Sequence, residues 1–221
     1  MQNRCKIAVC FSGYPRFYDR IDLKDYGNNI SVFFHSWSDK SESADKDSCV
    51  SAFTQRQDYL NYKADNDVVK YLSPKQYKIE SYKEKNSYFE NMYSRFRNCE
   101  GRTRRSVFPM YYSMNESIKL ALDSKEKFDI IVRTRFDLKL EQRLKFILDD
   151  NLHIPDQFHY FGFCDQFAYG PPALMKKYAE TYDYIKTIPD IQLNPEIILK
   201  KHLYREKVEV SLCDDWFYLL R

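Results

Sequence analysis

Residues 128–140, "FDIIVRTRFDLKL", join a buried strand to a row of charged side chains. Phe128 and the apolar run 130–132 predict a strand that is covered on both faces. From Arg133 onward, charged residues alternate with uncharged ones, and four share one side of the strand: Arg133, Arg135, Asp137 and Lys139. Alternate side chains lie about 6 to 7 Å apart on one face, so we expect them to point toward a common ligand. The competing interpretation is the exposed face of an edge strand.

Short apolar segments alternate with helical segments along the rest of the chain. The expected strands besides 128–140 are residues 6–11, 30–37, 77–82 and 207–214, and the expected helices are 55–72, 110–125, 173–186 and 194–206. Residues 83–106 are polar and aromatic without clean periodicity. This alternation predicts an α/β fold, a three-layer α/β/α sandwich with a mainly parallel central sheet. We expect residues 1–221 to form a single domain, either a complete protein or one domain of a longer one.

Composition narrows the class of protein. The 35 basic residues nearly balance 32 acidic ones, a net charge of +3 that argues against a nucleic-acid coat or a polybasic membrane anchor. The six cysteines form no CxxC pair or Cys/His cluster, so a cytosol-like reducing compartment is the simplest account. The apolar run near the N-terminus is too short for a signal peptide, and no segment approaches the roughly 20 apolar residues of a membrane span. We expect a soluble, cytoplasmic protein, in the host cytoplasm if the chain is viral.

Polar residues follow the first two predicted strands. Ligands of open α/β sheets bind beyond the carboxyl ends of the strands. The first strand runs into Ser12, Gly13, Tyr14 and Arg16, where small residues let backbone N–H groups approach an anion and the arginine adds charge. The second strand ends in candidates of mixed chemistry: His35, Trp37 and Asp39. The alternative for these is a structural histidine and a core tryptophan.

Two further stretches carry candidate chemistry. In "GFCDQFAYG", Asp165 lies among aromatic residues, where burial would raise the pKa of a carboxyl toward the range of a general base. The alternative is a helix cap or a buried hydrogen-bonding acid. The stretch "RFRNCEGRTRR", residues 95–105, holds five arginines and one glutamate. A solvated loop explains it most simply, and a clamp for an anionic ligand is the second interpretation.

Taken in order, these segments resemble a family of nucleotide-sugar-dependent glycosyltransferases with the GT-A fold, found in bacterial surface-polysaccharide clusters and large DNA viruses. The matching pieces are "KIAVCFSGYPR", "VFFHSW", "SMNESIKLAL", "IVRTRFDL", "CDQFAYGPPALMKKY" and "NPEIILKKHL". They span residues 6–203, nearly the whole chain.

The resemblance implies a Rossmann-like nucleotide-binding sheet whose first loop, Ser12 to Arg16, contacts the nucleotide. Residues 135–137 stand where such enzymes keep an Asp-x-Asp metal motif, but Arg135 replaces the first acid. Asp137 would then bind Mn²⁺ or Mg²⁺ at the donor diphosphate, with His202 as a further candidate ligand. Alternatively, Arg133 and Arg135 neutralise the diphosphate themselves. Asp165 falls where inverting relatives place the base, which a retaining enzyme would not need.

The resemblance thus implies a hexosyl- or deoxyhexosyltransferase that moves a sugar from a nucleoside-diphosphate sugar, with UDP-sugar favoured, to a hydroxyl of a glycan or glycoprotein acceptor. An aromatic run would form the sugar-binding wall: Phe158, Tyr160, Phe161 and Phe163. One alternative is a non-enzymatic module that binds RNA or another polyanion through Arg95 to Arg105. The other is a sugar-phosphate nucleotidyltransferase, against which the short loop from Ser12 to Arg16 counts.

Overall fold

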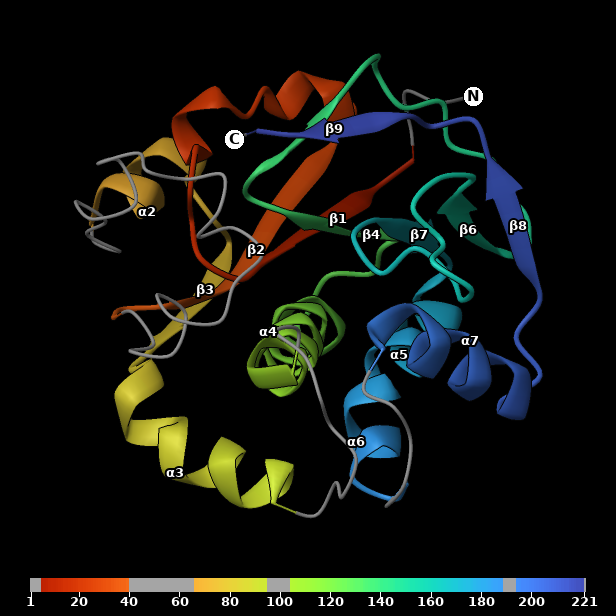
Figure 1. Cartoon of the computed structure of the whole chain (residues 1–221). Coiled ribbons are helices and arrows are strands. Elements are labelled where there is room, and N and C mark those ends of the chain that lie inside the picture. Colours follow the sequence, from red (N-terminus) through yellow and green to blue (C-terminus); the bar gives the residue numbers. More distant parts are fainter. Residues whose placement is uncertain (1–4, 40–65, 95–103, 189–193, 221) are drawn as a thin grey trace.

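The computed structural model describes residues 5–39, 66–94, 104–188 and 194–220. This part of the chain folds around a seven-stranded sheet with the order β3-β2-β1-β4-β7-β6-β8 (Figure 1). Its strands are β1 Ile7–Ser12, β2 Ile30–Trp37, β3 Gln76–Glu80, β4 Ile130–Arg135, β6 Leu152–Pro155, β7 Ala168–Gly170 and β8 Val210–Cys213. The first four are mutually parallel, whereas β7 runs antiparallel to β4 and β6. The mixed α/β class and the mostly parallel sheet are therefore confirmed.

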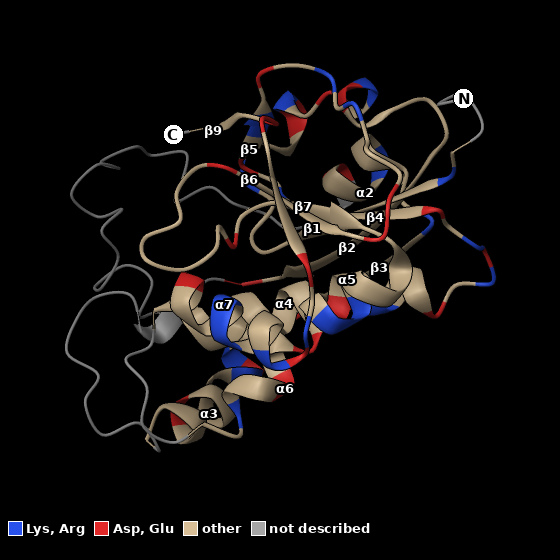
Figure 2. Cartoon of the chain, turned by 90° about the vertical axis from the view of Figure 1, so that its right-hand side faces the viewer, with Lys and Arg blue, Asp and Glu red and all other residues tan. Residues whose placement is uncertain are grey.

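Different kinds of structure cover the two faces of the sheet. The helices are α2 Asn66–Leu72, α3 Tyr82–Tyr93, α4 Arg104–Leu122, α5 Pro172–Ala179, α6 Thr181–Ile185 and α7 Pro195–Arg205. One face is covered by α4 and α5, with α6 and α7 packed beside them (Figures 1 and 2). The other face carries α2, two 3₁₀ turns (Tyr18–Arg20 and Leu23–Tyr26) and a small antiparallel sheet of β5 Leu138–Leu140 and β9 Phe217–Leu219. This second layer is less helical than the predicted sandwich.

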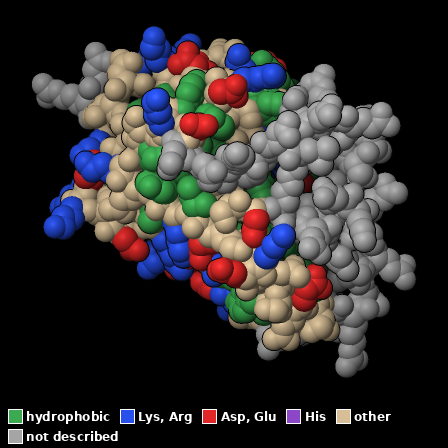
Figure 3. All heavy atoms as spheres, turned by 90° about the vertical axis from the view of Figure 1, so that its left-hand side faces the viewer, with side chains coloured by type: hydrophobic (Ala, Val, Ile, Leu, Met, Phe, Trp, Pro, Cys, Tyr) green, Lys and Arg blue, Asp and Glu red, His purple; other side chains and the backbone are tan. Residues whose placement is uncertain are grey.

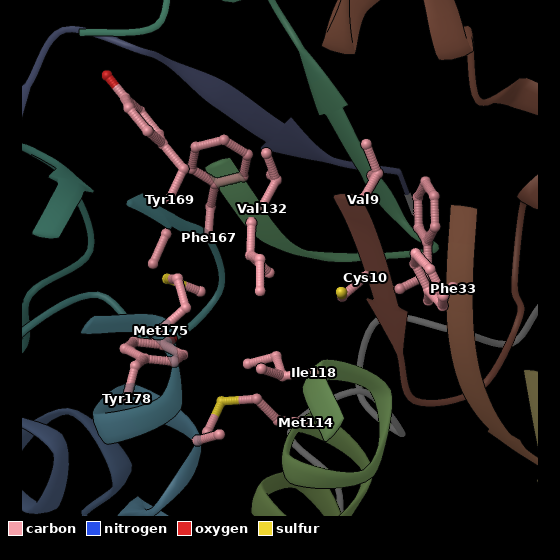
Figure 4. Packing of buried hydrophobic residues seen from close by; sticks show 14 of the residues in the cluster. Val9, Cys10, Phe33, Met114, Ile118, Val132, Phe167, Tyr169, Met175 and Tyr178 are labelled. Atoms are coloured by element: carbon pink, nitrogen blue, oxygen red, sulfur yellow. The ribbon is translucent and has the colours of Figure 1, made fainter. Parts of the chain in front are cut away.

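The inner strands β1, β2 and β4 are buried on both sides, as their apolar runs predict, whereas the residues of β3 and most of those of β8 are exposed or half-buried. Figure 4 shows Val9 and Cys10 on opposite sides of β1, with Cys10 directed toward Met114 and Ile118 of α4. All six residues of β1 are buried. An unbroken apolar strand of this kind is typical of the middle of a parallel sheet.

Aromatic rings fill the opposite face of β1. Phe11 stacks on Phe136 with 5.4 Å between ring centroids, and meets the ring of Tyr26 edge-on at 5.8 Å. The hydroxyl groups of Tyr26 and Thr134 are hydrogen-bonded at 3.2 Å. Such contacts favour packing over ligand stacking as the explanation for many of the aromatic residues.

The chain does not continue as one strand from residue 128 to 140. β4 ends at Arg135, Phe136 and Asp137 form a turn, and β5 belongs to the separate two-stranded sheet. The predicted alternation fails beyond Arg135 because Phe136 is buried between the rings of Phe11 and Phe34, which bends the chain away from the main sheet. Lys139 is consequently exposed on β5, apart from the two arginines.

Helix boundaries differ from the sequence predictions in four places, one of which is the predicted helix 173–186, since it is two helices, α5 and α6. α3 was not predicted, because its three buried residues, Tyr82, Phe89 and Met92, are interrupted by polar ones. α4 begins at Arg104 rather than residue 110 and includes Pro109. Of the predicted helix 55–72, residues 66–72 are helical and the helix stops before Pro74 as expected, while the remainder lies outside the described residues.

Charges of both signs are interspersed along the described helices and loops (Figure 2). Hydrophobic side chains gather on the face over α2 and β3 (Figure 3). There, the exposed Tyr71 uses its hydroxyl group to donate to the carbonyl oxygens of Asp19 and Ile21, both at 3.0 Å. Among the described helices, none is both long and apolar enough to cross a membrane.

Candidate functional site

The carboxyl ends of β1, β2 and β4 lie side by side at one edge of the sheet. Ser12 is in register with His35 of β2 on one side and with Arg135 of β4 on the other. The parallel strands have the order 3-2-1-4, so the chain crosses to opposite sides of β1 when it continues to β2 and later to β4. Ligands of doubly wound sheets bind at such a switch point. The geometry therefore brings together three of the predicted strand ends.

Arg133 is the most unusual residue at this edge. Its side chain is only 1% exposed, and its Nε and Nη1 atoms have no hydrogen-bond partner in the described structure. Its charge acts on the buried groups of Tyr111 in α4, Tyr178 in α5 and Asp165. A buried guanidinium without partners is destabilising. The N–H groups of these two nitrogens are donors that an anionic ligand would satisfy.

Asp165 faces the two arginines from the loop that precedes β7. It is 4% exposed, and burial raises the pKa of its carboxyl, although the charges of Arg133 and Arg135 oppose that rise. Within the described chain, no nitrogen of either arginine lies within 4.0 Å of its carboxylate oxygens, since the ion pair at this site joins Arg135 to Asp137 instead. The arginines and Asp165 thus attract one another without direct contact.

Arg135 and Asp137 form a two-bonded ion pair. The Nε and Nη2 atoms of Arg135 each donate to one carboxylate oxygen of Asp137 at 2.7 Å. Burial alone would raise the pKa of Asp137, but the charge and hydrogen bonds of Arg135, together with the charge of Arg16, lower it. Asp137 is therefore held as an anion. In this structure its carboxylate fixes the orientation of the Arg135 guanidinium.

The two predicted metal ligands are engaged elsewhere. Both oxygens of Asp137 accept from Arg135, and Nε2 of His202 donates to the carbonyl oxygen of Lys177 at 2.8 Å. The described residues contain no group of three His, Cys, Asp or Glu side chains placed to hold a metal ion. As arranged, these side chains do not fit a metal centre. Binding of Mn²⁺ or Mg²⁺ stays a prediction that requires Asp137 to leave Arg135.

The loop after β1 uses its backbone within the fold. Gly13 has φ of +103°, a conformation that strongly favours glycine, and its N–H donates to Ser113 Oγ at 2.8 Å and to the carbonyl oxygen of His35 at 3.3 Å. In this structure the N–H of Gly13 is therefore used within the fold, and anion binding at this loop stays a prediction. Arg16, three residues later, contributes its charge at Asp137. Ser12 is buried and Tyr14 is partly buried beside the same turn.

His35 and Trp37 are both buried, which agrees with the alternative interpretation of a structural histidine and a core tryptophan. The fully buried His35 ring is hydrogen-bonded through Nδ1 to Ser113 Oγ at 2.8 Å and through Nε2 to Glu80 Oε2 at 2.9 Å. Burial lowers the pKa of His35 despite Glu80, so we infer a neutral ring that donates to Glu80 and accepts from Ser113. Trp37 packs edge-on against His35 with 4.9 Å between ring centroids.

Asp39 also has a structural role. Its carboxylate accepts hydrogen bonds from the hydroxyl of Ser81, at 2.7 Å, and from the backbone N–H of Tyr82. It thereby satisfies donors at the start of α3, where a negative charge is favourable. Of the residues predicted to bind the donor, the two arginines of β4 and Arg16 remain the ones with charge near the acids.

Replacing Ser113 by Ala should destabilise the protein by about 1 to 3 kcal/mol, since it leaves the buried N–H of Gly13 and Nδ1 of His35 without their best partner. Urea denaturation measures the loss. Ser117→Ala is the matched control on α4, because that equally buried hydroxyl bonds only to the carbonyl oxygen of Met114 in its own helix. Equal losses in both variants would contradict a special role for Ser113.

Glu196 is part of the site, although its sequence context does not distinguish it from other acids. It lies in the first turn of α7, where an acid after Asn194 and Pro195 looks like an ordinary helix start. The fold buries it to 8% exposure, and burial together with the charge of Asp165 raises its pKa to about 7. Only the three-dimensional arrangement shows that this acid lies near Asp165.

The predicted aromatic wall is partly exposed. Phe158, Tyr160 and Phe161 have positive φ angles of 55°, 39° and 72°, and Phe161 is 92% exposed. Bulky side chains rarely adopt this backbone conformation. Phe163 instead packs edge-on against Tyr204 of α7 with 5.8 Å between ring centroids. The rings of Phe158, Tyr160 and Phe161 are therefore at the surface.

An open cavity of about 570 Å³ lies at the opposite, amino end of β4. Its lining includes Asp129, Asp149 and Asp150. Three acids would repel a diphosphate, so the cavity does not compete with the arginine site as a place for an anionic ligand.

No protein-family model matches this chain, and no curated protein sequence matches it either. The function is therefore argued from the fold and the arginine site.

Proposed function

We propose that the protein is a nucleotide-sugar-dependent glycosyltransferase with the GT-A fold. The observation that carries the proposal is Arg133, a buried guanidinium with two unpartnered nitrogens at the carboxyl end of β4. Arg135 adds a second guanidinium two residues later, and Arg16 brings a third positive charge near Asp137. Guanidinium groups match the oxygens of a diphosphate in charge and geometry.

The sheet supports a nucleotide ligand. Its parallel strands have the order 3-2-1-4, which is also the order of the first four strands in dinucleotide-binding sheets. The arginines lie at the end of β4, next to β1, where the strand order reverses. A nucleoside diphosphate bound there would place its phosphates toward Arg133 and Arg135.

Sugar transfer is the reaction that uses both kinds of charge in this site. As the bond between the sugar and the diphosphate breaks, negative charge grows on the leaving oxygen, and preorganised guanidiniums stabilise it. The acids, Asp165 and Glu196, can accept hydrogen bonds from sugar hydroxyls and a proton from the acceptor. The exposed rings of Phe158 and Phe161 offer apolar faces to sugar rings. The acceptor is accordingly a hydroxyl of a glycan or glycoprotein.

The first experiment is a thermal-shift screen with UDP-glucose, UDP-galactose, UDP-N-acetylglucosamine and GDP-mannose, each with and without Mn²⁺. A donor at 100 times its Kd should raise the melting temperature by roughly 5 to 10 °C. A shift that needs Mn²⁺ would show that Asp137 exchanges Arg135 for a metal, and an equal shift without it would show that the arginines suffice. No shift with any nucleotide sugar would count against the proposal.

The polyanion-binding alternative rests on residues 95–105, of which 95–103 lie outside the described residues. Affinity for RNA that falls steeply with salt, without any response to nucleotide sugars, would favour it. Formation of a nucleotide sugar from a sugar phosphate and a nucleoside triphosphate would favour the nucleotidyltransferase alternative.

A further inference from the structure

Asp165 and Glu196 belong to segments that the backbone ties together. The N–H of Phe163 donates to the carbonyl oxygen of Glu196 at 3.0 Å. Gly162 lies so close to α7 that a Cβ atom there would be 1.9 Å from the carbonyl carbon and oxygen of Glu196. On the other side, the hydroxyl of the buried Tyr111 donates to the carbonyl oxygen of Pro195 at 2.7 Å. The start of α7 is thus fixed against the loop that carries Asp165.

The two acids have different electrostatic surroundings. Burial raises the pKa of Asp165, and the charges of Arg133 and Arg135 oppose that rise. Glu196 faces Asp165 from the loop and Tyr111 from α4, and no cation among the described residues acts to lower its pKa. Burial and the charge of Asp165 raise the pKa of Glu196 to about 7, and its own backbone N–H opposes this rise. The pKa of Glu196 therefore lies in the range that suits a general base near neutral pH.

Two nitrogens of Arg133 without hydrogen-bond partners distinguish this region from an ordinary buried cluster of acids. Arg133 is 1% exposed, and its Nε and Nη1 atoms lack partners, while its charge acts on both Asp165 and Tyr111. The charge of Glu196 is also among the causes that raise the pKa of Tyr111. A cation with two unpartnered nitrogens and two acids therefore lie around the same buried region, as a ligand with both anionic and hydroxyl groups would require.

We propose that Glu196 is the catalytic base of sugar transfer, and that Asp165, the acid on which the charges of Arg133 and Arg135 act, binds hydroxyl groups of the donor sugar. This assignment rests on the proposed function. It differs from the expectation that Asp165 is the base. Two carboxyl groups in one site commonly take different roles because their environments differ.

Sugar transfer then proceeds by a single displacement at the anomeric carbon. The acceptor O–H gives its proton to the Glu196 carboxylate while its oxygen forms a bond to the anomeric carbon of the donor. The bond between that carbon and the diphosphate oxygen breaks, and its electron pair leaves with the nucleoside diphosphate beside Arg133 and Arg135. Glu196 then releases the proton to solvent. A single displacement inverts the anomeric configuration.

The test compares Glu196→Gln with Asp165→Asn, with methyl glycosides as acceptor probes and the nucleotide sugars of the screen as donors. Glu196→Gln should lower kcat roughly 100- to 10,000-fold with the donor KM nearly unchanged. The wild-type kcat should rise with pH through about 7, where Glu196 loses its proton, and the Gln variant should lose this dependence. Asp165→Asn should instead raise the donor KM and keep the dependence on pH.

Glu206→Gln is the matched control, because Glu206 lies at the other end of α7 and is paired with Arg205 at the surface. It should leave kcat and its pH profile unchanged. If the Gln variant at 196 does not fold, Glu196→Asp keeps the carboxylate and should show a lowered kcat that still rises with pH.

The possible results separate the assignment of Glu196 as the base from the proposal of glycosyl transfer itself. Wild-type kcat and pH profile in Glu196→Gln, or a product with retained configuration, would overturn the assignment of Glu196 and leave glycosyl transfer standing. A wild-type protein that transfers no sugar from any donor would overturn the proposed function, and the assignment with it. An inverted product together with loss of the pH dependence would support both.

Discussion

Replacing Arg133 by Met should abolish donor binding while leaving the fold at least as stable as the wild type. Arg133 is buried and two of its nitrogens have no partner in the described structure, so the fold gains little from its charge. Exchange of a poorly compensated buried ion for a well-packed apolar side chain is often neutral or stabilising. Loss of a buried charge-assisted contact to the diphosphate should weaken donor affinity by about 3 kcal/mol, more than roughly 100-fold.

Calorimetric titration with UDP and the melting temperature of the free protein measure the two effects separately. Arg143→Met is the matched control, because Arg143 is exposed and hydrogen-bonded to Asn28 at the surface. The control should keep both donor affinity and stability. A marked loss of stability in Arg133→Met, with UDP binding intact, would show that Arg133 is a structural residue and would remove the main support for the anion site.

Gly162→Ala should be among the most destabilising single-atom additions in this protein. The new Cβ would lie 1.9 Å from the backbone carbon and oxygen of Glu196 and 2.3 Å from the nitrogen of Ile197. These atoms form the first turn of α7 and cannot move aside as a flexible side chain would. We expect a loss of about 3 kcal/mol in the free energy of unfolding, the upper part of the range for overpacking.

Urea denaturation measures this loss, and Gly13→Ala provides the comparison. A Cβ at Gly13 meets no atom within 4 Å, so only the strain of φ at +103° opposes it, at about 1 to 2 kcal/mol. A smaller loss at Gly162 than at Gly13 would mean that the loop does not lie against α7 as described. Because that contact holds Glu196 near Asp165, any folded Gly162→Ala protein should also lose transfer activity.

Periodicity predicts β1, β2 and β4 well because these strands are buried on both faces, but the short strands β6 and β7 of the same sheet are absent from the prediction. Residues 6–11 and 30–37 are continuous apolar runs, and they form β1 and β2 almost without change. The same reasoning failed after Arg135, because local alternation cannot show that Phe136 packs under Phe11 and turns the chain into a second sheet. α3 was missed for a similar reason, since tertiary packing buries three side chains in an otherwise polar segment.

The sequence predicts part of the candidate site, and the residues that it misses are missed for physical reasons. Arg133 and Arg135 are predicted because they follow an apolar run, and Asp165 because it lies among aromatic residues. The fold places their charges near one another. His35 met the same criterion but is enclosed by Ser113 and Glu80, neither of which is near it in sequence. Glu196 was missed because its distinguishing property, burial beside Asp165, arises from contact between distant segments.

The central claim is that the arginines of β4 bind the diphosphate of a nucleotide sugar so that its sugar can be transferred. The most direct measurement is release of nucleoside diphosphate from the donor panel in the presence of methyl glycosides, by wild-type protein and by Arg133→Met. We predict that wild-type protein releases the diphosphate from at least one donor and forms the corresponding glycoside, and that Arg133→Met, although folded, does neither. Equal turnover by the two proteins, or no turnover of any donor by the wild type, would contradict the account.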